Sequence, residues 1–333
     1  MPKQLSSVTF YNGQKMPIVG LGTWQSPPEE VNAALDAALE RGYRHIDTAY
    51  MYQNEAAIGE TLKKWFDSGK LKREDIFIVT KLPPDGNRAE SVEKYIKRSL
   101  ASLQLEYVDL YLIHLPIGFE EKGDDLWPKD ETGAMIIDSS TDLISLWKAM
   151  EAQVDAGRAR SIGLSNFNSS QIARIVKAAR IKPANLQIEL NVYFQQRELV
   201  AFCRALDITV CAYAPIGSPG LAAVAKQRGQ ELPESAKFDL LKDPVVVEIA
   251  KRHNKTPVQV LLRHCMQRDI VVIPKSTNPR RIKENFEVFD FELTKEEVEK
   301  LDSLDKRFAG RRFLMDTYKR LNEHPEYPYA DPY

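Results

Sequence analysis

The chain of 333 residues has little of what marks secreted, membrane-spanning or nucleic-acid-binding proteins. Its three cysteines are too few and too scattered for a disulfide framework or a structural zinc site. No uninterrupted apolar run approaches the ~18–20 residues of a membrane span, and the polar residues 1–4 lack a signal-peptide core. The 46 basic and 47 acidic residues leave no basic surplus for nucleic acid or an anionic membrane. We therefore expect a cytoplasmic protein without either partner.

What the chain does have is a regular alternation of short apolar strands and amphipathic helical patterns. A hairpin is expected first, with a strand at 8–10 and a turn at Asn12-Gly13. Eight further strands, each followed by a helical pattern, are expected at 18–21, 43–48, 76–80, 108–114, 161–164, 186–190, 209–213 and 270–273. Apolar strands separated by helices predict a parallel sheet covered by helices. Eight units close a barrel, so we predict an α/β fold with a single (β/α)8 TIM barrel domain over 1–333.

Three segments exceed what the barrel requires. Residues 117–140 and 217–243 each lie between a strand and the next helix, which places them on the C-terminal face of the barrel. Active sites of such barrels lie on this face, and long loops there shape a substrate pocket. The third segment is a tail, residues 306–333, which has little periodicity and is expected to pack near the same pocket.

Polar residues stand where the predicted strands end. Asp47, Lys81 and His114 follow three successive strands, and Tyr52 lies in the loop five residues after Asp47. An Asp–Lys pair by itself is often only a structural salt bridge. Beside a tyrosine, however, the ammonium favours the phenolate and lowers a pKa that is ordinarily near 10. His114 could donate a hydrogen bond to a substrate carbonyl oxygen. Together the four residues then form a general acid that protonates this oxygen while negative charge develops on it.

A phosphate site is expected after the eighth strand. Asn278-Pro279 has the pattern of an N-cap and first helical residue, which would leave backbone N–H groups free at the helix start. Lys275, Ser276 and Arg281 surround this start, and such a set suits a 2′-phosphate and hence NADPH over NADH. An ordinary capped helix with solvated arginines is the alternative. Gly20-x-Gly22 is a weak dinucleotide fingerprint, because Gln25 stands at the third glycine position.

Five motifs together resemble the aldo-keto reductase signatures, and the match is collinear from about Val8 to Leu304. The motifs are Gly20-Leu21-Gly22-Thr23-Trp24, Asp47-Thr48-Ala49-Tyr50-Met51-Tyr52-Gln53-Asn54-Glu55, Leu112-Ile113-His114-Leu115-Pro116, Gly163-Leu164-Ser165-Asn166-Phe167 and Ile273-Pro274-Lys275-Ser276. Within the superfamily the chain is similar to the aldose and aldehyde reductases, and it also resembles an insect ecdysteroid-reductase branch.

The resemblance implies NADPH-dependent reduction of aldehydes and ketones by a monomer. No metal site is expected, because the histidines are widely separated in the sequence and lack carboxylate partners. Tyr52 would donate the proton, Lys81 and Asp47 would tune it, and His114 would orient the carbonyl. The nicotinamide would stack on Tyr213, with its carboxamide bound by Ser165, Asn166 and Gln187. The full set of cofactor residues implied also includes Gly22, Thr23, Trp24, Asp47, Gly217, Ser218, Lys275, Ser276, Thr277, Asn278, Arg281, Glu284 and Asn285.

The chain departs from the aldose-reductase pattern in two places. An ion pair that latches the loop after the seventh strand is replaced by Gln25 and Gly220, which predicts a looser loop over the cofactor. Pro83 and Leu115 stand where those relatives carry tryptophans, which leaves Trp24 as the clearest aromatic wall. The expected substrate pocket therefore favours an apolar aldehyde or a bulky, steroid-like ketone, and its residues are Trp24, Tyr52, Pro83, His114 and Leu115.

Two other functions remain as alternatives. A lysine at a barrel strand end can be the nucleophile of a Schiff-base aldolase, although pairing with Asp47 would make Lys81 a poor nucleophile. The barrel could also bind a nucleotide as a structural or sensory subunit without turnover. The presence of all four residues Asp47, Tyr52, Lys81 and His114 favours catalysis over this second alternative.

Overall fold

The computed structural model describes residues 6–227, 229, 231–315 and 318–330. It begins with the predicted hairpin, in which β1 (Ser7–Thr9) pairs antiparallel with β2 (Lys15–Pro17). Side chains from the hairpin turn reach the N-terminal halves of two barrel strands, since Asn12 Nδ2 donates to Ser161 Oγ and Gln14 Nε2 to Asp109 Oδ1. The hairpin therefore covers the N-terminal end of the barrel, opposite the strand ends that carry the candidate site.

Eight parallel strands form the barrel and pair in chain order, as predicted. They are β3 (Leu21–Gly22), β4 (His45–Asp47), β5 (Phe77–Leu82), β6 (Val108–Ile113), β7 (Ala159–Ser165), β8 (Asn185–Glu189), β9 (Thr209–Tyr213) and β10 (Ile270–Val272). Parallel bridges from Val19 to Val272 and from Gly22 to Lys275 join the first strand to the last. The first strand is regular only at its end, so its predicted span of 18–21 was displaced toward the N-terminus.

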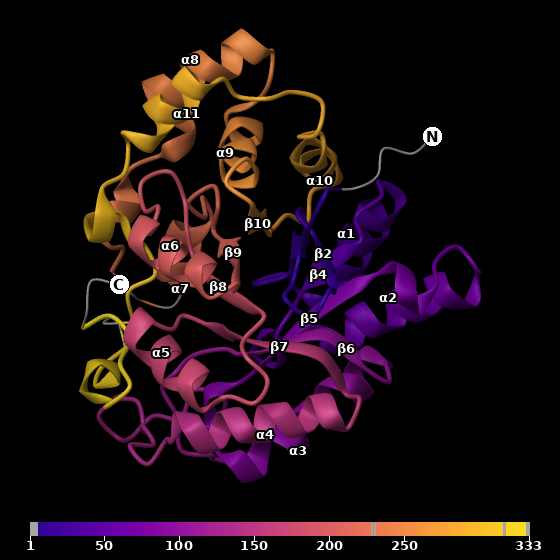
Figure 1. The fold of residues 1–333 in the computed structure, drawn as a ribbon, viewed down its shortest axis with the longest axis vertical. Helices are drawn as coiled ribbons and strands as arrows, with labels where there is room; N and C mark the ends of the chain where they lie inside the picture. Colours follow the sequence, from indigo (N-terminus) through magenta and orange to yellow (C-terminus); the bar gives the residue numbers. More distant parts are fainter. Residues whose placement is uncertain (1–5, 228, 230, 316–317, 331–333) are drawn as a thin grey trace.

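Helices surround the sheet, as Figure 1 shows. Those at the predicted places are α1 (Pro28–Glu40), α2 (Glu55–Asp67), α3 (Ala89–Leu103), α4 (Leu143–Asp155), α5 (Ser169–Ala178), α6 (Arg197–Ala205), α8 (Pro244–His253), α9 (Pro257–Met266) and α10 (Pro279–Phe286). Two helices were not predicted. The first, α7 (Leu221–Gln227), is a short helix within the loop after β9, and the second, α11 (Lys295–Asp302), has only two apolar residues in its span.

The main core lies between the sheet and the inner faces of these helices. In α1 the residues at helical spacing, Val31, Ala34, Leu35, Ala38 and Leu39, are all buried. Nearly all strand residues are buried as well, as expected when side chains fill a barrel on the inside and meet helices on the outside.

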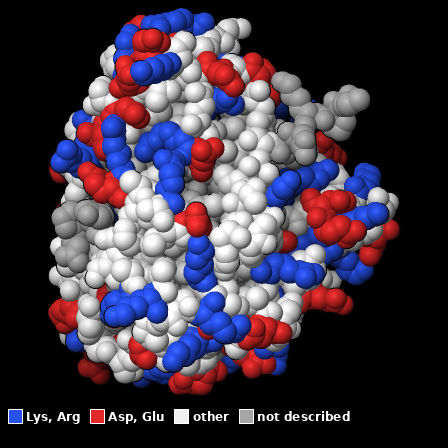
Figure 2. Space-filling model, in the orientation of Figure 1, with Lys and Arg blue, Asp and Glu red and all other residues white. Residues whose placement is uncertain are grey.

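The surface carries both signs of charge side by side. Figure 2 shows Lys and Arg interspersed with Asp and Glu around this face and a largely uncharged area at its centre. Among the helices of the described residues, none has the length and apolarity of a membrane span.

Candidate active site

The four side chains predicted to form the general-acid group come together at the C-terminal ends of β4, β5 and β6. The ammonium of Lys81, on β5, is fully buried and lies 2.7 Å from Asp47 Oδ1 and 2.8 Å from the carbonyl oxygen of Thr48. It lies 3.5 Å from the hydroxyl of Tyr52. Because three acceptors enclose this ammonium, it has neither the exposure nor the free lone pair that a Schiff-base nucleophile needs. The geometry argues against the aldolase alternative.

The pKa of Tyr52 is shifted in the direction opposite to the one predicted from the sequence. Burial raises this pKa, and although the Lys81 ammonium opposes the rise, it does not reverse it. The predicted lowering was therefore wrong, because the cost of burying a phenolate exceeds the attraction of one ammonium already shared with Asp47. Burial alone would lower the pKa of Lys81, but Asp47 and Tyr52 leave it raised. At neutral pH the site thus holds a protonated phenol beside a charged lysine.

His114 lies across from Tyr52 and is neutral. The two ring centroids are 5.7 Å apart, with the rings at 76°. Burial, with a smaller contribution from Lys81, holds the pKa of His114 well below its usual range. Its Nδ1 is buried without a partner among the described residues, whereas Nε2 is not enclosed in this way. A neutral imidazole carries one N–H and is therefore able to donate a single hydrogen bond toward the mouth of the barrel.

The residues predicted to hold the nicotinamide meet beside this group. Asn166 donates to Ser165 Oγ and to the carbonyl oxygen of His114, and its Oδ1 accepts from the Tyr213 hydroxyl at 2.7 Å. Gln187 Nε2 donates to Asp47 Oδ2 at 2.6 Å, so it also positions a member of the catalytic group. Among the described residues nothing donates to Gln187 Oε1, and the Ser165 hydroxyl donates to nothing. One free acceptor and one free donor match a carboxamide, so the site fits the group.

The predicted phosphate site is arranged differently from the expectation. Asn278 caps α10, and its Oδ1 accepts from the backbone N–H groups of Arg280 and Arg281 at 3.0 and 3.1 Å. These donors are therefore not free, because a side chain of the helix's own N-cap competes for them. The cationic and hydroxyl side chains remain: Arg281 is exposed, Ser276 is buried, and Lys275 is exposed and donates to the Gln25 carbonyl oxygen at 3.1 Å.

The other predicted cofactor residues lie at strand ends, in the loops that follow them, or in the last turn of α10. Thr23 donates to the Asp47 carbonyl oxygen, Asn285 is buried, and Glu284 accepts from Arg280. Gly220 is exposed, and a Cβ added to it would meet nothing within 4 Å. Gly22, Thr277, Gly217 and Ser218 also lie at or beyond strand ends of the barrel.

The predicted substrate residues Trp24, Pro83 and Leu115 lie close to the tail and to loop 117–140. Trp24 packs edge-on against Phe313 of the tail, with ring centroids 5.7 Å apart. Pro83 is buried and Leu115 is partly exposed against an apolar cluster formed by loop 117–140 and the tail. Trp127 belongs to this cluster and stacks on Tyr318 of the tail at 5.0 Å, with the rings inclined by 14°.

The tail reaches the site through residues that were not predicted from the sequence. Phe313 also packs edge-on against Tyr213 at 5.5 Å, and the Tyr329 hydroxyl donates to Asn166 Oδ1 at 3.3 Å. Glu189, at the end of β8, accepts from the backbone N–H groups of Arg312 and Phe313. Its place at a strand end was a signal, but no motif connects it to a tail more than a hundred residues away.

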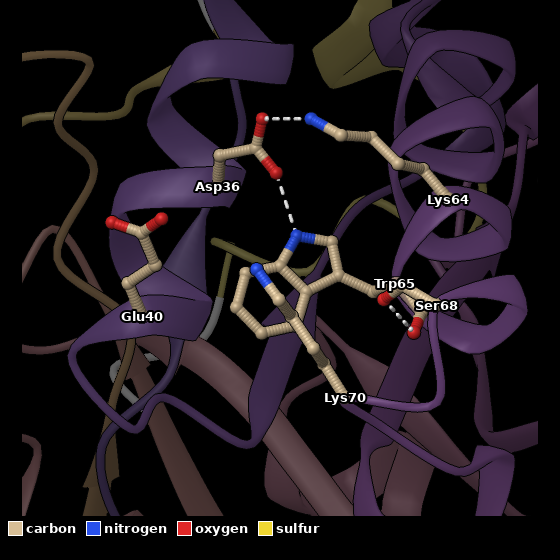
Figure 3. A pocket seen from close by; sticks show the side chains of 6 residues that line it. All are labelled: Asp36, Glu40, Lys64, Trp65, Ser68 and Lys70. Carbon is tan, nitrogen blue, oxygen red and sulfur yellow. Dashed lines mark hydrogen bonds and ion pairs between the residues drawn. The ribbon is translucent and has the colours of Figure 1, made fainter.

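A separate surface pocket of about 120 Å³ lies between α1 and α2 and contains none of these residues (Figure 3). Asp36 there accepts hydrogen bonds from Trp65 Nε1 and Lys64 Nζ, and the Lys70 ammonium lies 5.3 Å from the Trp65 ring centroid. These contacts join the two helices, so we read the pocket as part of their packing.

Comparisons with known proteins agree with this arrangement. The model of the Aldo/keto reductase family matches residues 18–306. Aldo-keto reductase family 1 member A1 of Mus musculus is 44% identical, and that of Bos taurus 45% identical, each over 98% of this chain and 99% of the relative. The solved aldose reductase from Schistosoma japonicum superposes with a TM-score of 0.88 at 45% identity, covering 98% of this chain and 100% of that chain.

The fold and the rim define a barrel enzyme that acts on carbonyl groups. The chain belongs to the aldo-keto reductase family, as the resemblance predicted. It is therefore an oxidoreductase that uses a nicotinamide cofactor of the NAD(P)H type on small-molecule carbonyl compounds.

Proposed function

We propose that this protein reduces aldehydes and ketones to alcohols with NADPH and that Tyr52 is the general acid. The observation that carries the proposal is the position of the Tyr52 hydroxyl, 3.5 Å from an ammonium that Asp47 holds charged. A raised pKa keeps the phenol protonated until a carbonyl oxygen gains negative charge. The cofactor, when bound, supplies the hydride.

The surrounding residues act on the proton and on the carbonyl oxygen. Tyr52 gives its O–H proton to that oxygen, and the Lys81 ammonium stabilises the phenolate that remains. Nε2 of His114 donates a hydrogen bond to the same oxygen and orients the substrate. Gln187 donates a hydrogen bond to the second oxygen of Asp47, which fixes the orientation of the carboxylate toward Lys81.

Three further proposals concern the cofactor, the substrate and the chain as a whole. Lys275, Ser276 and Arg281 bind the 2′-phosphate and make NADPH the preferred cofactor. Trp24, Pro83 and Leu115, joined by Phe313, form an apolar pocket that favours an apolar aldehyde or a bulky ketone. The chain works as one domain and a monomer in the cytoplasm, with the tail from residue 306 as part of the pocket wall.

Tyr52→Phe tests the central assignment, because it removes the acid and keeps the ring. We expect turnover of a panel of aldehydes and ketones, followed by NADPH absorbance, to fall about 100-fold or more while NADPH still binds. Cofactor binding is measured by fluorescence titration of both proteins. Binding without turnover by the wild-type protein across the panel would favour the nucleotide-binding barrel, and full activity of the variant would exclude Tyr52 as the acid.

A further inference from the structure

Arg312 in the tail joins the two ends of the long loop after β9. Its Nη1 donates to the carbonyl oxygen of Gly217 at 2.6 Å, and its Nη2 donates to that of Phe238 at 2.5 Å. The side chain is 5% exposed. A guanidinium presents its N–H groups in a fixed planar fork, so one side chain can hold two carbonyl groups of different segments in place.

Glu189 sets the position of this arginine. Its buried carboxylate accepts from the backbone N–H groups of Arg312 and Phe313 at 2.8 and 3.0 Å, one on each oxygen. The carboxylate also faces the guanidinium groups of Arg311 and Arg312, which oppose the rise that burial causes in the pKa of Glu189. An acidic side chain at the end of a barrel strand thus fixes the backbone from which Arg312 extends.

Gly217 is shaped to receive the guanidinium. A Cβ built on this residue would lie 3.0 Å from both the Cζ and Nη1 atoms of Arg312 and 2.9 Å from Leu240 Cδ1. Its φ of +74° is also one that glycine adopts readily. A side chain at position 217 would occupy the space that the Arg312 guanidinium fills, so this contact requires a glycine at 217.

We propose that Arg312 is a positioning residue for the cofactor: it fixes Gly217-Ser218 and thereby sets how fast the nicotinamide cofactor dissociates. The inference rests on the proposed function, in which Gly217 and Ser218 contact the cofactor. The ion-pair latch of the aldose-reductase type is replaced here by Gln25 and Gly220, so the loop has no such tie near Gly220. Arg312 holds the loop instead at Gly217 and Phe238.

The test compares two arginine-to-lysine variants. Arg312→Lys keeps a positive charge opposite Glu189 but cannot reproduce the fork, because a lysine presents one point of charge. Arg174→Lys is the control: Arg174 makes a two-pronged contact with Glu326 of the tail, at 3.0 and 2.5 Å, and has no hydrogen bond or ion pair with the described residues of the loop. The measurements are NADPH dissociation by stopped-flow fluorescence, hydrogen exchange of cofactor-free peptides containing Gly217 or Phe238, and melting temperature.

We expect Arg312→Lys to release NADPH about tenfold faster, the effect of losing one hydrogen bond from a charged donor. Peptides containing Gly217 or Phe238 should exchange faster in this variant and not in Arg174→Lys. Unchanged dissociation and exchange would overturn the inference, even if the melting temperature fell, because a purely structural role predicts that pattern. If the wild-type protein binds no NADPH, the proposed function fails, and the exchange data alone then decide whether Arg312 holds the loop.

Discussion

Replacing Glu55 by glutamine should make the protein more stable at alkaline pH. Glu55 is the first residue of α2 and is 4% exposed. It accepts a 2.5 Å hydrogen bond from the hydroxyl of Thr80, the residue before Lys81 on β5. Burial raises its pKa from 4.5 to about 7, although the Thr80 hydroxyl and the Lys81 ammonium oppose the rise. The folded protein therefore disfavours the ionised carboxylate.

The size and sign of the effect follow from these two pKa values. A rise from 4.5 to about 7, at 1.36 kcal/mol for each pKa unit, corresponds to about 3 kcal/mol. Below pH 4.5 the carboxyl is neutral in both folded and unfolded chains and costs nothing. As the pH rises from 4.5 to 7 the unfolded chain ionises first, so the free energy of unfolding falls, and above pH 7 the loss is complete. Glu55→Gln resembles the neutral form and lacks this loss.

The assay is urea unfolding of both proteins between pH 5 and pH 9, followed by fluorescence and circular dichroism to check that the transitions coincide. The stability difference in favour of Glu55→Gln should grow with pH to at most about 3 kcal/mol. Glu60→Gln, an exposed change on the same helix, should show no such growth. A difference that does not vary with pH would refute the reasoning.

Two further predictions concern packing and cofactor choice. Gly20→Ala should lower stability by about 2 kcal/mol, because its Cβ would lie 2.5 Å from Nδ1 of the buried His45, whereas Gly220→Ala, with nothing within 4 Å, should melt like the wild type. Equal melting of the two variants would contradict this packing. Lys275→Met and Arg281→Met should each weaken NADPH binding about tenfold in fluorescence titrations and leave NADH binding nearly unchanged. Equal weakening of both cofactors would exclude these residues as ligands of the 2′-phosphate.

Much of the fold was predictable because strand and helix patterns are local. A helical pattern was predicted after the third strand, where α3 (Ala89–Leu103) lies with an unbroken apolar spacing. The short α7 and the polar α11 were missed because neither has an apolar stripe long enough to mark it. The groups at the strand ends were also predictable, because a barrel brings the ends of successive strands to one rim.

The rest of the site depends on contacts that no local pattern records. The direction of the Tyr52 pKa shift depends on how completely the phenol is buried, and the use of the α10 N–H groups depends on where the Asn278 side chain turns. The Glu189–Arg312 contact joins residues 123 positions apart, and no sequence pattern links residues at such a distance.

The contact between His324 of the tail and loop 117–140 constrains how the substrate pocket of such an enzyme can change during evolution. The Nδ1 of His324 accepts from the backbone N–H of Glu326, so Nε2 carries the proton and donates to the carbonyl oxygen of Asp138 at 2.9 Å, while the backbone N of Gly118 lies 3.1 Å from the same nitrogen. A tail residue thus holds the far end of loop 117–140 and contacts its start. The wall of the mouth is thus built from two segments, separate from the strand ends that hold Asp47 and Lys81 and from the loop that holds Tyr52. An exchange of loop 117–140 between relatives will succeed only when its matching tail is transplanted with it, and the chemistry of the rim can be inherited unchanged.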